Sequence, residues 1–115
     1  MTVKKDFGTS FHLDRAFGKN PIHFHLFDLY QVGEICCERE YEIPLHVQQC
    51  DEISFILSGK GVFYIDDAPL AVHSGDVVLS KTGQRHFIRS DRSEKLRFAY
   101  LGYRFHSGDL GTAWC

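Results

Sequence analysis

The chain has 115 residues, of which 43% are hydrophobic and 14% are aromatic, and its formal net charge at pH 7 is -2. This length indicates one domain, which can bury roughly two thirds of its unfolded surface in a single core. The slightly acidic balance argues against a surface built to bind nucleic-acid phosphates, so any contact with DNA is expected to need another segment.

The beginning of the sequence shows no clean hydrophobic period. Phe7, Phe11 and Phe17 are scattered among lysines and glycines there. We therefore expect residues 1–20 to form an irregular N-terminal arm whose phenylalanines pack on the domain that follows.

The segment after Pro21 is rich in residues that favour strands, and residues 22–33 predict one or two of them. His23 and His25 would share one face of such a strand. Two interpretations stay open, a metal clamp or exposed and hydrogen-bonded histidines, and we favour the second. Residues 34–44 alternate acidic and apolar side chains and indicate a solvated sheet face.

From Asp51 onward the sequence predicts short strands separated by turns. Gly59-Lys60-Gly61 supplies one turn, because glycine adopts left-handed backbone conformations without strain. A strand that begins at Pro69 suits a sheet edge. No stretch shows sustained helical periodicity, so the pattern predicts an all-β sandwich or barrel. The expected strands are residues 51–58, 62–65, 69–72, 77–79, 85–89 and 95–105.

Targeting and redox features favour a cytoplasmic protein. No charged and then apolar leader opens the sequence, and no apolar run approaches the roughly 20 residues needed to cross a bilayer. The cysteines form no C-x2-C pair, so we expect free thiols in a reducing compartment.

Residues able to do chemistry gather in two segments, 46–59 and 75–90. These segments resemble the paired motifs of the cupin family, G-x5-H-x-H-x3-E-x6-G and G-x5-P-x-G-x2-H-x3-N. The matching residues are His46, Glu52 and Gly59 in the first motif and Gly75, Gly83 and His86 in the second. The resemblance implies a cupin fold, a double-stranded β-helix or jelly-roll barrel.

Several motif positions carry other residues. Glu40 stands for the leading glycine of the first motif, and Gln48 stands for its second histidine. In the second motif, Lys81 replaces the proline and Ser90 replaces the asparagine. The lost histidine removes one ligand from the four-ligand metal site that the family pattern implies.

The remaining donors still suggest a candidate metal site. His46, Gln48 and Glu52 share strand parity and can face the same interior. With His86 they offer two imidazoles, one carboxylate and one amide oxygen, a set that could hold iron, manganese, nickel or zinc. Because an amide oxygen is a poorer donor than imidazole, we expect weaker affinity than in a typical metal-binding cupin. The alternative is that both histidines are hydrated and bonded to Glu52 without an ion.

A second resemblance covers roughly residues 27–105. Residues 29–34, 52–61, 75–79 and 96–105 are similar to the amino-terminal sensor domain of AraC family transcription regulators. In that family the barrel binds a small effector, often a sugar or other metabolite, and a separate helix-turn-helix domain binds DNA. The resemblance therefore implies a non-catalytic, dimeric effector-binding domain whose DNA contacts lie outside this chain.

A sensor of this kind needs a pocket with apolar walls and a few placed polar groups. We place the barrel at residues 21–106 and a C-terminal tail at residues 107–115, beyond which a DNA-binding domain is expected in a longer protein. The second interpretation is a stand-alone metal-dependent cupin enzyme of the isomerase or dioxygenase type, and the third is an interaction module without a small ligand. The expected ligand-binding residues are His46, Gln48, Glu52, Phe55, Phe63, Arg85, His86, Phe98 and Tyr100.

Overall fold

The computed structural model describes residues 8–106, which form an all-β domain. The predicted fold class is thereby confirmed, and the expected tail at residues 107–115 lies outside the described residues. No helix in residues 8–106 has the length and apolar character to cross a membrane. The strands are β1 (Thr9–Ala16), β2 (Ile22–His23), β3 (Phe27–Cys37), β4 (Glu42–Val47), β5 (Asp51–Ser58), β6 (Lys60–Ile65), β7 (Ala68–His73), β8 (Val77–Ser80), β9 (Arg85–Ser90) and β10 (Leu96–Phe105).

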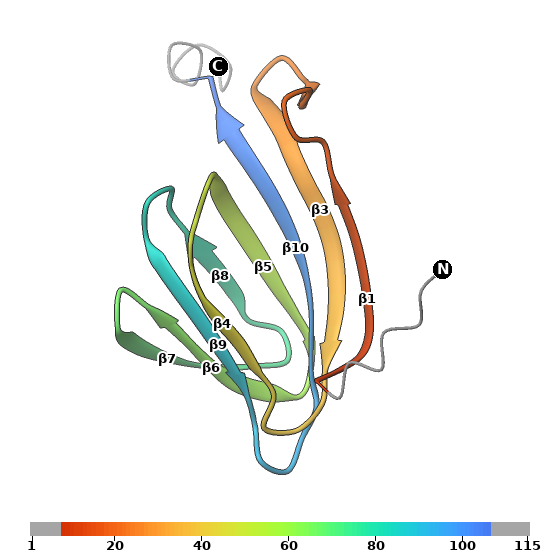
Figure 1. The fold of residues 1–115 in the computed structure, drawn as a ribbon, viewed down its shortest axis with the longest axis vertical. Helices are drawn as coiled ribbons and strands as arrows, with labels where there is room; N and C mark the ends of the chain where they lie inside the picture. The colour runs from red at the N-terminus through yellow and green to blue at the C-terminus, as the bar shows by residue number, and fades with distance from the viewer. Residues whose placement is uncertain (1–7, 107–115) are drawn as a thin grey trace.

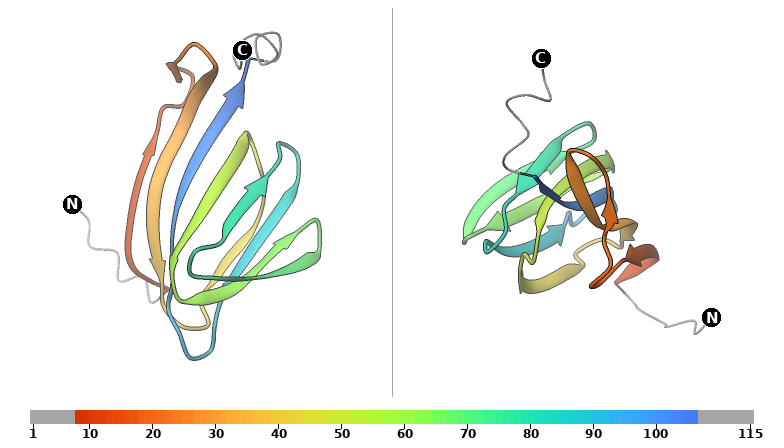
Figure 2. Two further views of the ribbon diagram at one scale, coloured as in Figure 1. Left: turned by 180° about the vertical axis from the view of Figure 1, so that it is seen from behind. Right: turned by 90° about the horizontal axis from the view of Figure 1, so that it is seen from above.

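These strands form two antiparallel sheets that face each other (Figure 1). The larger sheet has the order β1-β3-β10-β5-β8, and β2 pairs with β3. The smaller sheet has the order β4-β9-β6-β7, so the strand that begins near Pro69 does lie at an edge. Seen from above, the strands form two layers (Figure 2). Neighbours such as β3 and β10 are far apart in sequence, which explains why no local repeat predicts this order.

The core fills the space between the two sheets and follows the two-residue period of the strands. In β10, Leu96, Phe98 and Tyr100 point inward and are buried. The Phe63 ring, which has no exposed surface, packs edge-on against Phe98 at a centroid distance of 5.4 Å. The core residues are Ile35, Cys37, Ile56, Phe63, Val72, Val78, Ile88, Leu96, Phe98 and Tyr100.

Two glycines of the Gly59-Lys60-Gly61 turn have different roles. Gly59 has a φ of 76°, in the left-handed region, as the sequence predicts. Gly61 lies within β6, and a Cβ there would stand 2.5 Å from the carbonyl oxygen of Arg89. Gly61 is thus needed for close approach of β9 and not for turn freedom, which corrects the expectation. Glu40, in the place of the motif glycine, keeps a positive φ of 61°.

The expectation of an irregular N-terminal arm is wrong for part of its length. Residues 9–16 form β1, which pairs along its length with β3 at the edge of the larger sheet. Phe11 packs against the sheet as expected, with the Arg97 guanidinium 4.9 Å from its ring centre. An edge strand of this kind is held by backbone hydrogen bonds on one side, so its sequence need not show an apolar alternation.

The acidic segment that leads into the start of β4 is solvated and paired with basic residues, as its alternation predicts. Glu38 lies 3.3 Å from the Lys95 ammonium, and Glu42 lies 3.1 Å from the Arg89 guanidinium. Exposed pairs of this kind contribute at most about 1 kcal/mol each. They therefore cover the sheet face without forming a site.

Candidate functional site

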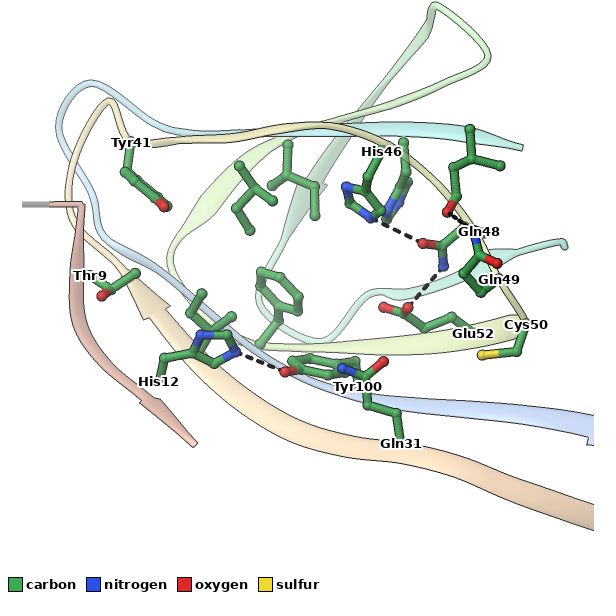
Figure 3. Close-up of a pocket in the computed structure, with 16 residues that line it drawn as sticks. Thr9, His12, Gln31, Tyr41, His46, Gln48, Gln49, Cys50, Glu52 and Tyr100 are labelled. Carbon is green, nitrogen blue, oxygen red and sulfur yellow. Dashed lines mark hydrogen bonds between the residues drawn. The ribbon is translucent and has the colours of Figure 1, made fainter. Parts of the chain in front are cut away.

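A cavity of about 330 Å³ opens between the two sheets (Figure 3). Its volume is within the range of small-molecule sites. Strands β1, β3, β5 and β10 build one side, and β4, β9 and the β4–β5 connection build the other. The lining residues are Thr9, His12, Gln31, Ile35, Tyr41, Ile43, His46, Val47, Gln48, Gln49, Cys50, Glu52, His86, Ile88, Phe98 and Tyr100.

A row of hydrogen bonds connects His46, Gln48 and Glu52 in this cavity (Figure 3). The His46 Nδ1 lies 3.0 Å from the Pro44 carbonyl oxygen, which can only accept, so this nitrogen donates. The His46 Nε2 lies 3.0 Å from Gln48 Oε1, and Gln48 Nε2 donates to Glu52 Oε2 at 2.8 Å. Gln48 thus stands between the imidazole and the carboxylate and separates them.

His86 lies behind this row and is 1% exposed. Its Nε2 is 3.3 Å from Ser80 Oγ, and its ring meets the His46 ring edge-on at a centroid distance of 5.3 Å. Burial, followed by the nearby His46, lowers the pKa of His86 to about 4. His86 is therefore neutral at pH 7. Burial also raises the pKa of Glu52, and the Gln48 hydrogen bond opposes this rise.

A second polar group lines the opposite wall of the cavity. Tyr100 donates its phenol proton to Asp14 Oδ1 at 2.6 Å, and His12 Nε2 lies 2.8 Å from the same phenol oxygen. Gln31 Nε2 also donates to Asp14 Oδ1, at 2.7 Å. Burial and then the Asp14 carboxylate raise the pKa of Tyr100 far above its ordinary value, so the phenol keeps its proton.

The predicted metal ligands do not converge on a common point. In residues 8–106, no group of three or more His, Cys, Asp or Glu side chains is placed to hold an ion. The His46 Nε2 faces the Gln48 amide, and the His86 Nε2 faces the Ser80 hydroxyl. As arranged, the donor set of His46, Gln48, Glu52 and His86 therefore does not fit a metal centre.

Most of the predicted ligand-binding residues meet at the cavity. His46, Gln48, Glu52, His86, Phe98 and Tyr100 all line it. Phe63 lies one layer deeper, where its ring packs on His86 at a centroid distance of 5.4 Å. Their role in binding a ligand stays a prediction.

Two predicted residues, Phe55 and Arg85, lie outside the cavity, which corrects the expectation. Phe55 is 38% exposed because its parity is opposite to that of Glu52 and Ser54, so it points to the outer face of β5. Arg85 directly precedes the inward-facing His86 and therefore points outward, where it forms an exposed ion pair with Asp67. The cavity thus has no guanidinium from this position.

Ten lining residues were not predicted, and four of them belong to β1 and β3. Gln31 and Ile35 point to the same face of β3 as Gly33. The Tyr100 side chain lies over Gly33, because a Cβ on Gly33 would be 2.3 Å from the Tyr100 oxygen. The two-residue period of β3 is the signal that could have found them. His12 had no such signal, because β1 lacks a clear alternation.

Comparisons with known proteins agree with this architecture. Residues 38–102, more than half of the chain, match the cupin domain family. No curated protein matches the chain.

Solved structures with the same fold share little sequence with this chain. A cupin protein from Bacteroides fragilis is 20% identical with a TM-score of 0.62, and the match covers 88% of this chain and 79% of that one. A Cupin 2 conserved barrel domain protein from Salinispora arenicola is 18% identical with a TM-score of 0.62, covering 84% and 77%. A predicted oxalate decarboxylase from Thermotoga maritima is 19% identical with a TM-score of 0.58, covering 88% and 96%. These likenesses support the jelly-roll barrel, and the family match shows that the chain belongs to the cupin family.

Proposed function

We propose that this cupin domain binds a small-molecule effector without catalysing a reaction, as the sensor domain of an AraC-type transcription regulator. The observation that carries the proposal is the cavity in which Gln48 bridges His46 and Glu52. Side-chain hydrogen bonds on two walls and apolar residues between them suit recognition of a small organic molecule. DNA binding would belong to a domain outside this chain.

Binding is tested on the 115-residue chain with a library of small metabolites, using NMR shifts of backbone amides. The proposal expects saturable shifts that gather at residues lining the cavity, such as Gln31, Glu52 and Tyr100. Shifts confined to the outer faces of the sheets would contradict it.

A metal-dependent cupin enzyme is the second candidate, favoured by the presence of His46, Glu52 and His86 in one cavity. Elemental analysis of protein purified without chelator separates the two. The effector-binding proposal expects less than about 0.1 equivalent of iron, manganese, nickel or zinc, since the lone pairs of the donors do not converge. Stoichiometric metal that is lost in a Glu52→Ala variant would favour the enzyme.

We further propose that the domain is a homodimer that buries the outer face of the larger sheet. Phe55, Val77, Leu79 and Leu101 are between 37% and 57% exposed there. They lie side by side, because Phe55 pairs with Val77 and Ile53 pairs with both Leu79 and Leu101. An exposed apolar patch of this kind is typical of an interaction surface.

The dimer is tested by light scattering at micromolar concentration. The expected mass is twice that of the 13.2 kDa chain, and a Leu79→Lys variant is expected to be monomeric because it places a charge in the interface. A matched control, Leu45→Lys, changes a residue of β4 in the smaller sheet that is as exposed as Leu79, at 57%, and should leave the mass unchanged. A monomeric wild-type protein would contradict the proposal.

A further inference from the structure

The cationic side chains near the barrel point away from its cavity. Among the lining residues there is neither a lysine nor an arginine. Arg97 lies 2.7 Å from Glu34 and Arg89 lies 3.1 Å from Glu42, both on the outer faces of the sheets, while Arg85 is paired with Asp67. Carboxylates and phosphates are normally held by charge-assisted bonds from such groups. The cavity is therefore poorly suited to an anionic ligand.

The cavity instead contains a carboxylate that has no lysine or arginine beside it. Glu52 Oε2 accepts from Gln48, whereas Glu52 Oε1 accepts from Ser54 Oγ at 3.5 Å, the outer limit of a hydrogen bond. In residues 8–106 no lysine or arginine pairs with Glu52, and His46 reaches it only through the Gln48 amide. A partly buried carboxylate of this kind is stabilised when a positive charge comes beside it.

The opposite wall adds further negative character and aromatic surface. Tyr100 and Gln31 each donate a hydrogen bond to the exposed Asp14, so this carboxylate lies beside two residues of the cavity wall. The rings of Phe98 and Tyr100 line the same space. Aromatic faces attract organic cations, and the attraction strengthens when the cation is desolvated. In Figure 3 the Glu52 carboxylate projects toward the space between Gln48 and Tyr100.

We propose that the ligand of this cavity is a small organic cation, a metabolite with a protonated amine whose ammonium group binds Glu52 Oε1 beside the rings of Phe98 and Tyr100. The inference rests on the effector-binding function proposed above and names its ligand class. Gln31 and Gln48 supply neutral hydrogen bonds for the rest of the molecule. The ammonium group takes the place at Glu52 that a lysine or arginine side chain would otherwise fill.

The test compares ligands that differ only in charge. A panel of small primary amines, each matched with the alcohol and the carboxylic acid of the same skeleton, is titrated into the 115-residue chain at pH 7 and followed by NMR. We expect the amines to shift the amides of cavity residues and to bind at least tenfold more tightly than their alcohols, while the acids do not bind. The variant Glu52→Gln should weaken amine binding at least tenfold and weaken alcohol binding much less, because the amide oxygen still accepts a hydrogen bond from a hydroxyl. Glu42→Gln, which removes an exposed carboxylate on the outer face, should change neither.

The outcomes separate this inference from the broader proposal. Alcohols or acids that bind in the cavity as well as or better than the amines would overturn the cation assignment and leave effector binding standing. The same holds if a Glu52→Gln variant that still binds the alcohols keeps the full affinity for the amines. If no member of the panel and no metabolite of the larger library binds in the cavity, both proposals fail.

Discussion

The variant Gly59→Ala is expected to lose about 2–6 kcal/mol of unfolding free energy, a large part of what a small domain has. Two effects add. A residue with a side chain at a φ of 76° is strained, at a cost of about 1–3 kcal/mol. Its Cβ would also lie 1.6 Å from the carbonyl oxygen of Lys95, which is backbone and cannot rotate away. Forced overlap in a packed region costs about 1–3 kcal/mol more. Urea unfolding followed by fluorescence of the intrinsic aromatic residues measures the loss.

Gly75→Ala is the matched control for this experiment. Gly75 has a similarly positive φ of 93°, but a Cβ there meets nothing within 4 Å. The control should therefore show the backbone strain alone, about 1–3 kcal/mol. Equal losses in the two variants would contradict a steric role for Gly59 and leave only the turn conformation. If Gly59→Ala does not fold at all, the proteolytic stability of both variants in cell extract still ranks them.

The sequence predicted the strands from β5 to β10 well because their signals are local. Alternating side chains mark each strand, and glycines mark several of the turns between them. The order of the sheets depends on pairings such as β3 with β10, which no local pattern encodes. Strand β1 was missed because six of its eight residues, Ser10 and His12 to Ala16, are exposed, so no apolar alternation distinguishes it from a loop. The division of the chain into arm, barrel and tail stays a prediction.

Part of the candidate site was also predicted from local signals in the sequence. Motif spacing and strand parity brought His46, Glu52 and His86 to one cavity. Phe55 could have been excluded, because the parity that turns Glu52 inward turns Phe55 outward. The bridging position of Gln48 could not have been predicted, since it depends on side-chain orientations in the β4–β5 connection. Those orientations are set by contacts between strands.

Lowering the pH from 7 to 4 is expected to destabilise the domain through His86. The pKa of this imidazole is about 4 in the folded protein and 6.5 when it is fully solvated, so between these values the unfolded state binds more protons. The stability that His86 contributes is complete above pH 6.5 and is lost as the pH falls toward 4. A tenfold change in proton affinity corresponds to about 1.4 kcal/mol. Solvent screening of the imidazole charge reduces the full effect of the shifted pKa, so we expect the unfolding free energy to fall by roughly 2 kcal/mol in total.

The carboxyl groups Asp28 and Glu52 change the unfolding free energy either below this pH range or with the opposite sign. Asp28, whose pKa is lowered chiefly by a hydrogen bond from His23, loses its contribution only below about pH 4. Glu52 has a raised pKa, so its effect on stability has the opposite sign: folding is favoured as the pH falls through that pKa. The His86 contribution is therefore measured as a difference between protein variants and not from the wild-type curve alone.

The measurement compares urea unfolding of the wild type and of His86→Gln at intervals between pH 4 and pH 7. The difference in unfolding free energy should shrink as the pH falls, because only the wild type carries the titrating imidazole. His73→Gln removes an imidazole whose side chain is 75% exposed and should reproduce the wild-type dependence. Should His86→Gln fail to fold, NMR of the His86 ring in the wild type gives the same answer. A ring that becomes protonated near pH 6.5 would show that His86 is solvated and that the buried contact with Ser80 does not persist in solution.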